Sequence, residues 1–140
     1  MPLIWTRNMS VGIARFDEDH KRLIRYVNEL GDAIQDGKSK GAIDPVEIEV
    51  ILHRMENYAR AHFLAEEKVM EITGYPGLEE HRAEHRKFIA TVAEISGRCL
   101  GSSQQKCANE IAQFLYDWII NHVYQVDGLY VEHLRKNGVE

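Results

Sequence analysis

The segment from His62 to His85 holds two pairs of potential metal ligands on either side of a turn. His62 and Glu66 are four positions apart, as are His81 and His85, and Gly74-Tyr75-Pro76-Gly77 lies between the pairs. Residues four apart share one face of an α-helix, and a tetrapeptide rich in glycine and proline interrupts a helix. The segment therefore predicts two helices folded back on each other, each offering two ligands to a common site.

Helical apolar patterns run through most of the chain, with no convincing strand. They predict helices near 18–37, 45–73, 78–98 and 103–135, joined by short loops. This pattern is typical of an all-α fold, an antiparallel up-down-up-down four-helix bundle. We expect residues 1–140 to form one domain. Residues 1–16 have no sustained period, and we expect them to be an N-terminal arm that docks on the bundle through Trp5.

Two helix starts carry clear signals. Asp17 is the expected N-cap of the first helix, since acidic residues follow it and favour the positive end of the helix dipole. Asp44 is the expected N-cap of the second helix, with Pro45 in the first helical position. Gly74 is placed to end the second helix.

Charge and hydropathy exclude several protein classes. The net charge is −5, from 17 basic and 22 acidic residues, and no basic patch indicates nucleic-acid binding. No apolar run is long enough for a membrane span, and residues 1–16 lack the apolar stretch of a secretory signal. The sequence thus predicts a soluble cytoplasmic protein. In that compartment Cys99 and Cys107 are expected to be free thiols, although a short loop between helices allows them to pair.

Ionisable side chains interrupt the apolar stripe of every predicted helix. A single histidine at such a position is usually a core residue with a hydrogen-bond partner, but five imidazoles and two carboxylates in one small core cannot satisfy each other. A metal centre would satisfy all of them. Glu67, His53 and His133 fall off the stripes or near the chain end and are expected to face solvent. The seven residues on the stripes are His20, His62, Glu66, His81, His85, His122 and Asp127.

The last two ligands have an unusual spacing. His122 and Asp127 are five positions apart, so an ideal helix would point them in different directions. Gly128 weakens the helix at this point. We expect either a π-bulge, which inserts one extra residue into a turn, or ligands that converge from different heights.

The number and type of ligands limit the metal chemistry. Seven ligands exceed the four of a structural zinc ion, but they suit two ions bridged by two carboxylates. Imidazole and carboxylate suit iron, manganese, zinc or copper. The Glu-x-x-His pair of ferritin-like di-iron sites is absent from the sequence. Five neutral imidazoles against two anions should favour holding dioxygen over activating it.

The ligand pattern resembles that of hemerythrin, and in particular its bacterial branch. The matching motifs are Asp17-Glu18-Asp19-His20, His62-x-x-x-Glu66, His81-x-x-x-His85 and His122-x-x-x-x-Asp127. Trp5, the segment Ser10-Val11-Gly12-Ile13, Glu66-Glu67, Tyr75-Pro76 and Tyr130 also match. The resemblance covers nearly the whole chain, and all seven ligand positions are filled in order.

The resemblance implies a non-haem di-iron centre with an oxo or hydroxo bridge that binds dioxygen reversibly. One iron would take His81, His85 and His122, the other His20 and His62 with an open position, and Glu66 and Asp127 would bridge them. Pocket walls near the open iron are expected to come from Leu23, Ile24, Phe63, Trp118 and Ile119, which also suit ordinary core packing.

This centre would make the protein a dioxygen carrier, store or supplier and not an enzyme. It is expected to be a monomer, with a protein recipient of the oxygen as a possible partner. Two alternatives remain: an enzyme that reduces peroxide or nitric oxide, and a sensor of oxygen or iron that acts through a separate partner.

Overall fold

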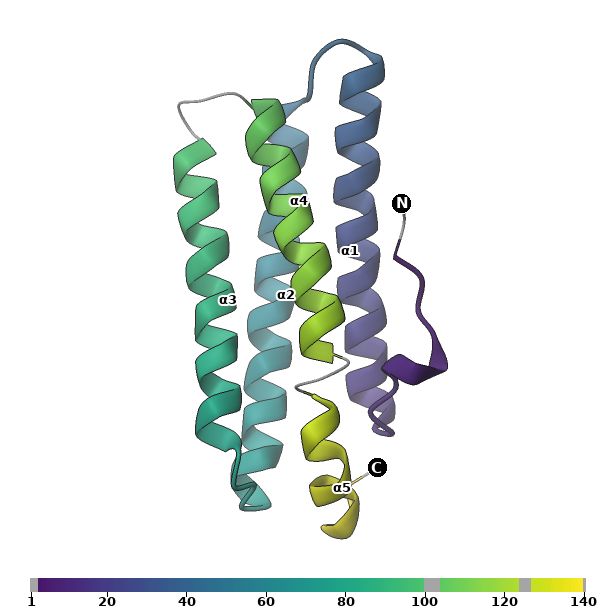
Figure 1. Cartoon of the computed structure of the whole chain (residues 1–140), viewed down its shortest axis with the longest axis vertical. Coiled ribbons are helices and arrows are strands. Elements are labelled where there is room, and N and C mark those ends of the chain that lie inside the picture. Colours follow the sequence, from purple (N-terminus) through teal and green to yellow (C-terminus); the bar gives the residue numbers. More distant parts are fainter. Residues whose placement is uncertain (1–2, 100–103, 124–126, 140) are drawn as a thin grey trace.

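The computed structural model describes residues 3–99, 104–123 and 127–139. Within these ranges the chain is helical and contains no strand, and the long helices form an antiparallel bundle (Figure 1). This confirms the predicted fold class. α1 packs against α2 and α4, and α3 also packs against α2 and α4. The elements are η1 (Arg7–Met9), α1 (Ala14–Ser39), α2 (Pro45–Ile72), α3 (Leu78–Cys99), α4 (Gln104–Asn121) and α5 (Gly128–Lys136).

The first helix begins earlier than predicted. It starts at Ala14 without a side-chain cap, so Asp17 lies inside the first turn and is not the N-cap. The Asp17 carboxylate instead accepts hydrogen bonds from the backbone N–H of Val11 (2.8 Å) and from the hydroxyl of Ser10 (2.5 Å). Asp17 therefore fixes the turn that leads into the helix.

The second helix begins and ends at the predicted signals. Asp44 is the N-cap, and its carboxylate accepts a hydrogen bond from the backbone N–H of Val46 at 3.0 Å. Pro45 occupies the first helical position. Gly74, just beyond the last turn, has φ +68°, a left-handed conformation that glycine adopts without strain. These residues fix where α2 enters and leaves the bundle.

The N-terminal arm docks on the bundle, as expected. The side-chain amide of Asn28 in α1 holds Leu3 by both backbone groups, accepting from its N–H and donating to its C=O, each at 2.8 Å. Leu3 and Met9 are buried, and Trp5 packs partly buried against the core. The arm therefore covers the side of α1.

A layer of buried polar residues separates two apolar clusters. The larger cluster contains Leu23, Phe63, Phe88, Leu115 and Ile119 among others. The smaller one contains Val11, Ile13, Phe16, Met70, Tyr130 and Leu134. Along α1 the order is Phe16 of the smaller cluster, then buried His20, then Leu23 of the larger cluster. α3 repeats this order, whereas the antiparallel α2 and the α4–α5 segment run through it in reverse, so the ionisable side chains form one level of the bundle.

The predicted fourth helix is divided in two. α4 ends at Asn121 and α5 begins at Gly128, so the prediction of one helix over 103–135 was wrong. His122 and Val123 form a π turn, and the backbone N–H of Asp127 donates to the C=O of His122 at 2.8 Å, five residues back. This is the predicted irregularity, and it allows both residues to face the same site.

Two other expectations concern the cysteines and the membrane. Cys107 is disulfide-bonded, which contradicts the expectation of free thiols; the side chain of Cys99 lies outside the described part. Among the described residues, no helix combines the length and the apolar character that crossing a membrane requires.

Candidate metal centre

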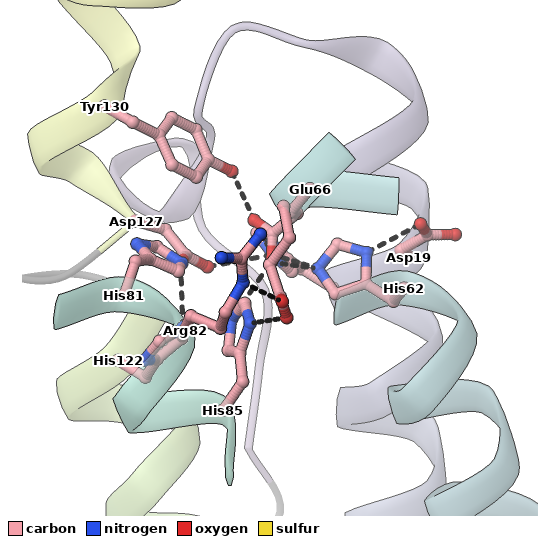
Figure 2. Close-up of polar contacts among 11 residues, drawn as sticks. Asp19, His62, Glu66, His81, Arg82, His85, His122, Asp127 and Tyr130 are labelled. Carbon is pink, nitrogen blue, oxygen red and sulfur yellow. Dashed lines mark hydrogen bonds and ion pairs between the residues drawn. The ribbon is translucent and has the colours of Figure 1, made fainter. Parts of the chain in front are cut away.

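The structure brings all seven predicted ligands together in the polar layer, and Figure 2 labels each of them except His20. Each is at most 3% exposed. α1 supplies one of them, α2 and α3 supply two each, and the junction between α4 and α5 supplies two. In chain order they are His20, His62, Glu66, His81, His85, His122 and Asp127. Spacing of four residues aims the pairs on α2 and α3, and the π turn aims the last pair.

Glu66 lies between the histidines of three helices. Its Oε1 is 3.0 Å from Nε2 of His62 and 3.5 Å from Nε2 of His85. Its Oε2 is 3.8 Å from Nε2 of His20. This one carboxylate thus lies close to imidazoles from three different helices.

Asp127 occupies an equivalent central place. Its Oδ1 is 2.9 Å from Nε2 of His81 and 2.8 Å from Nε2 of His122. Its Oδ2 is 3.0 Å from Nε2 of His20. Asp127 therefore also lies among imidazoles from different helices, and it is the second of two central carboxylates.

The potential ligand atoms fall into two groups that share Glu66. One group comprises His20, His62 and Glu66, and the other Glu66, His81, His85, His122 and Asp127. Within each group the ligand atoms lie within 4.8 Å of one another. Such a pair of groups suits two cations that share a carboxylate.

Many of these atoms have no hydrogen-bond partner. They are Nδ1 of His20, Oε1 of Glu66, Nε2 of His81 and His85, both ring nitrogens of His122, and both oxygens of Asp127. The nitrogen–oxygen distances are short, but the groups do not meet hydrogen-bond geometry. Unpaired polar atoms at such depth are costly. Cations among them would satisfy the carboxylate oxygens and one nitrogen of each imidazole, so the donor set fits metal ions that accept imidazole and carboxylate.

The metal-free layer binds protons strongly. Burial disfavours the imidazolium forms, but the neighbouring carboxylates outweigh it and raise the pKa of His20 to about 10 and that of His62 to about 9. Burial likewise opposes ionisation of Glu66 and Asp127, yet the surrounding histidines hold both pKa values well below the usual range. The carboxylates therefore demand positive charge, which protons supply when metal does not.

Two of the histidines are oriented by a second carboxylate. Nδ1 of His62 lies 2.7 Å from Asp19, and Nδ1 of His85 lies 2.8 Å from Glu67. A hydrogen bond from Nδ1–H fixes the tautomer and leaves Nε2 free to bind metal. Glu67 was expected to face solvent, and that prediction was wrong. The sequence signal that could have identified these two carboxylates is their adjacency to predicted ligands, because Glu67 follows Glu66 and Asp19 precedes His20.

Tyr130 adds a hydrogen bond to the central carboxylate. Its hydroxyl donates to Oε2 of Glu66 at 2.5 Å, and the ring is fully buried (Figure 2). Burial and the charges of Glu66 and Asp127 raise the pKa of the phenol well above its ordinary value, so it remains a donor. Sequence reasoning marked Tyr130 only through the family resemblance and gave it no role.

Two of the five predicted pocket residues stack on histidines of the layer. Phe63 is buried and stacks on the ring of His85, with centroids 3.9 Å apart and planes 7° apart. Trp118 is partly buried and stacks on His122 at 4.1 Å and 12°. These two rings cover histidines of the larger group. The other three predicted residues, Leu23, Ile24 and Ile119, are buried in the adjoining apolar cluster.

The two remaining histidines lie elsewhere. His53 is exposed and contacts Asn57, as expected for a surface residue. His133 is partly buried, and its Nε2 lies 3.0 Å from the backbone oxygen of Thr73. The expectation that His133 faces solvent was therefore wrong, since it ties α5 to the end of α2.

Comparisons with known proteins agree with this geometry. The family model of the Hemerythrin HHE cation binding domain matches residues 11–134. The chain is 33% identical to a bacteriohemerythrin of Pseudomonas aeruginosa, over 99% of this chain and 85% of that protein. A bacteriohemerythrin of Methylococcus capsulatus is 30% identical, over 91% and 93% of the two chains.

Solved structures show the same likeness. A crystal structure of wild-type hemerythrin superposes with a TM-score of 0.77 at 26% identity, covering 96% of this chain and 98% of that one. Sequence and structure thus match over nearly the full length, and the matched range contains all seven buried ligands. The chain belongs to the hemerythrin family.

Proposed function

We propose that this protein binds dioxygen reversibly at a di-iron centre in the polar layer, as a carrier, store or supplier and not as an enzyme. The observation that carries the proposal is the pair of ligand groups sharing Glu66. One group contains three histidines and the other contains two. Two ions of the same metal would therefore have different numbers of protein ligands. The metal with fewer ligands is the one that can accept a small molecule.

The division of ligands follows the two groups. His81, His85 and His122 would hold one iron, and His20 and His62 the other. Glu66 and Asp127 would bridge them, together with an oxo or hydroxo group. Support comes from the distances, because each carboxylate reaches histidines of both groups. The bound irons would supply the redox-active site to which dioxygen attaches.

The chain's own residues would make this binding reversible. The layer is closed to water on both sides by apolar clusters, and Glu66 is held by Tyr130 from the smaller cluster. A dry site limits the proton access that favours irreversible oxidation. Ile24, Leu23 and Ile119 would form the apolar wall nearest to His20, with Phe63 and Trp118 beside them. A monomer in the cytoplasm, with a separate protein recipient of the oxygen, remains our prediction.

Anaerobic reduction followed by air tests the proposal. We expect two irons per chain by metal analysis, and a visible charge-transfer band that appears with air and disappears under vacuum. His62→Ala should remove the band, whereas His53→Ala, which alters an exposed histidine, should leave it unchanged. Immediate oxidation that vacuum does not reverse would contradict reversible binding, and one zinc ion per chain would contradict the di-iron centre.

A further inference from the structure

The two carboxylates that orient histidines are themselves held in different ways. Asp19 receives Nδ1 of His62 on one oxygen, at 2.7 Å, and the hydroxyl of Tyr58 on the other, at 2.6 Å. Both donors come from α2, whereas Asp19 belongs to α1. This contact crosses the seam between α1 and α2 through a neutral phenol, over whose ring the guanidinium of Arg22 lies at 4.9 Å.

Glu67 is held by an ionic clamp instead. One oxygen faces Nδ1 of His85 at 2.8 Å, and the other accepts from Nε of Arg82 at 3.0 Å. Arg82 also pairs with Glu79 at 2.8 Å. This contact crosses the seam between α2 and α3. The two histidines that flank Glu66 therefore depend on separate seams and on separate outer partners.

We propose that Asp19 and Tyr58 are positioning residues for His62, and that they set the metal affinity of the His20/His62 group independently of the other group. The inference rests on the proposed two-metal centre. The imidazole of His62 can rotate about its side-chain bonds, and the Asp19 carboxylate fixes both its rotation and its tautomer, with Nε2 toward Glu66. Tyr58 fixes the Asp19 carboxylate in turn. Loss of such an outer partner typically lowers metal affinity by about 10- to 100-fold.

The independence has a geometric reason. Asp19 and Tyr58 make no contact with His81, His85 or His122 among the bonds described, and Glu67 makes none with His20 or His62. The groups share the central carboxylates, and the ring of Phe63 lies beside both His62 and His85. A substitution at Asp19 should therefore lower the affinity for the metal at His20 and His62 far more than the affinity for the other metal.

Titration of the metal-free full chain with Co²⁺, followed by visible absorption and metal analysis, tests the proposal. The wild type should take up two Co²⁺ ions. Asp19→Ala should weaken one of the two binding steps by about 10- to 100-fold and change the other less than about threefold. Tyr58→Phe should weaken the same step by a smaller factor, and Asp19→Glu should restore part of it. Glu67→Ala should weaken the other step.

Tyr26→Phe is the matched control, because the ring of Tyr26 lies 6.1 Å from that of Tyr58 but does not bond to Asp19. It should leave both steps unchanged. A second readout is the exchangeable imidazole N–H resonance of the Co²⁺-loaded protein. Asp19→Ala should speed solvent exchange of one such proton, which a general loss of stability would not do selectively.

The contrary results are distinct. Equal weakening of both steps by Asp19→Ala, or no weakening of either, would overturn the positioning role. In a His20→Ala background, Asp19→Ala should have no further effect on the remaining step, and a full additional effect would also overturn it. Should Asp19→Ala fail to fold, Tyr58→Phe decides by the same criterion. Two bound Co²⁺ ions without oxygenation of the iron protein would overturn only the proposed function.

Discussion

The large apolar cluster and the polar layer beside it are built from the same helices but depend on opposite physical effects. In the cluster, side chains such as Leu115 and Phe88 are buried among other apolar groups and are stabilised by removal from water. In the layer, ionisable groups are buried equally deeply, and many of their atoms lack hydrogen-bond partners. The comparison teaches that the residues that stabilise this bundle and the residues that could bind metal lie at different levels along its axis.

Substitution at the shared carboxylate should have the largest effect. Glu66→Ala removes the residue that belongs to both ligand groups in the described part of the chain, so we expect loss of both metals, with affinities reduced by more than about 100-fold, beyond the loss typical of an outer partner. Metal analysis after equilibrium dialysis measures this. Glu132→Ala, which alters an exposed carboxylate in α5, is the control. Full metal content in Glu66→Ala would show that the layer does not depend on a shared ligand.

Substitution in the apolar cluster should have the opposite profile. Leu115 is fully buried, and Leu115→Ala should lower the free energy of unfolding by about 2–5 kcal/mol through lost burial and a cavity. Denaturant titration measures this change. The metal content at equilibrium should stay at the wild-type value below the unfolding transition. Loss of metal without unfolding would show that metal binding in the polar layer depends on packing in the apolar cluster.

The polar layer should make the metal-free protein sensitive to pH. The pKa values of His20 and His62 are raised to about 10 and about 9 in the folded chain, above the unfolded value near 6.5. Their contribution is fully present below about pH 6.5 and is lost as pH rises through 9 to 10. We expect the free energy of unfolding to fall by on the order of a few kcal/mol over this window.

Thermal unfolding at several pH values measures that decline. The metal-loaded protein should show a flatter profile, because metal replaces the protons on these nitrogens. Metal-free protein that becomes more stable between pH 7 and 10 would contradict the assignment of charge in the layer.

The smallest effect should come from the end of the bundle away from the layer. Asp44 caps α2 through Val46, and Asp44→Ala should lower the free energy of unfolding by about 1 kcal/mol. Metal affinity should not change. Denaturant titration and Co²⁺ titration of the same sample provide the two measurements, and a coupled loss of affinity would show that the levels are not separate.

The sequence predicted well which ionisable side chains meet in the buried layer, because helical spacing encodes which residues share a face. Four-residue spacing identified His62 with Glu66 and His81 with His85, and five-residue spacing revealed the irregular turn before Asp127. The exact boundary between α4 and α5 was not predictable, because a π turn and a continuous helix have nearly the same local sequence preferences.

The outer contacts could not be predicted from the sequence. Tyr58 reaches Asp19 across 39 positions, and Glu67 reaches His85 across 18. Such pairs depend on how two helices are rotated against each other, which the pattern of one helix does not contain. The start of α1 was missed for a similar reason, because Ser10 and Val11 engage the carboxylate of Asp17.

The position of the π turn after α1, α2 and α3 in the chain bears on the order in which the centre is completed during synthesis. The hydrogen bond from Tyr130 to Glu66 joins residues 64 positions apart in the sequence. Asp127 shortly precedes Tyr130. A nascent chain that has released α1, α2 and α3 from the ribosome still lacks one central carboxylate and the phenol that holds the other. We therefore expect metal to be captured only after α5 has left the ribosome, and not while the growing chain contains α1, α2 and α3 alone.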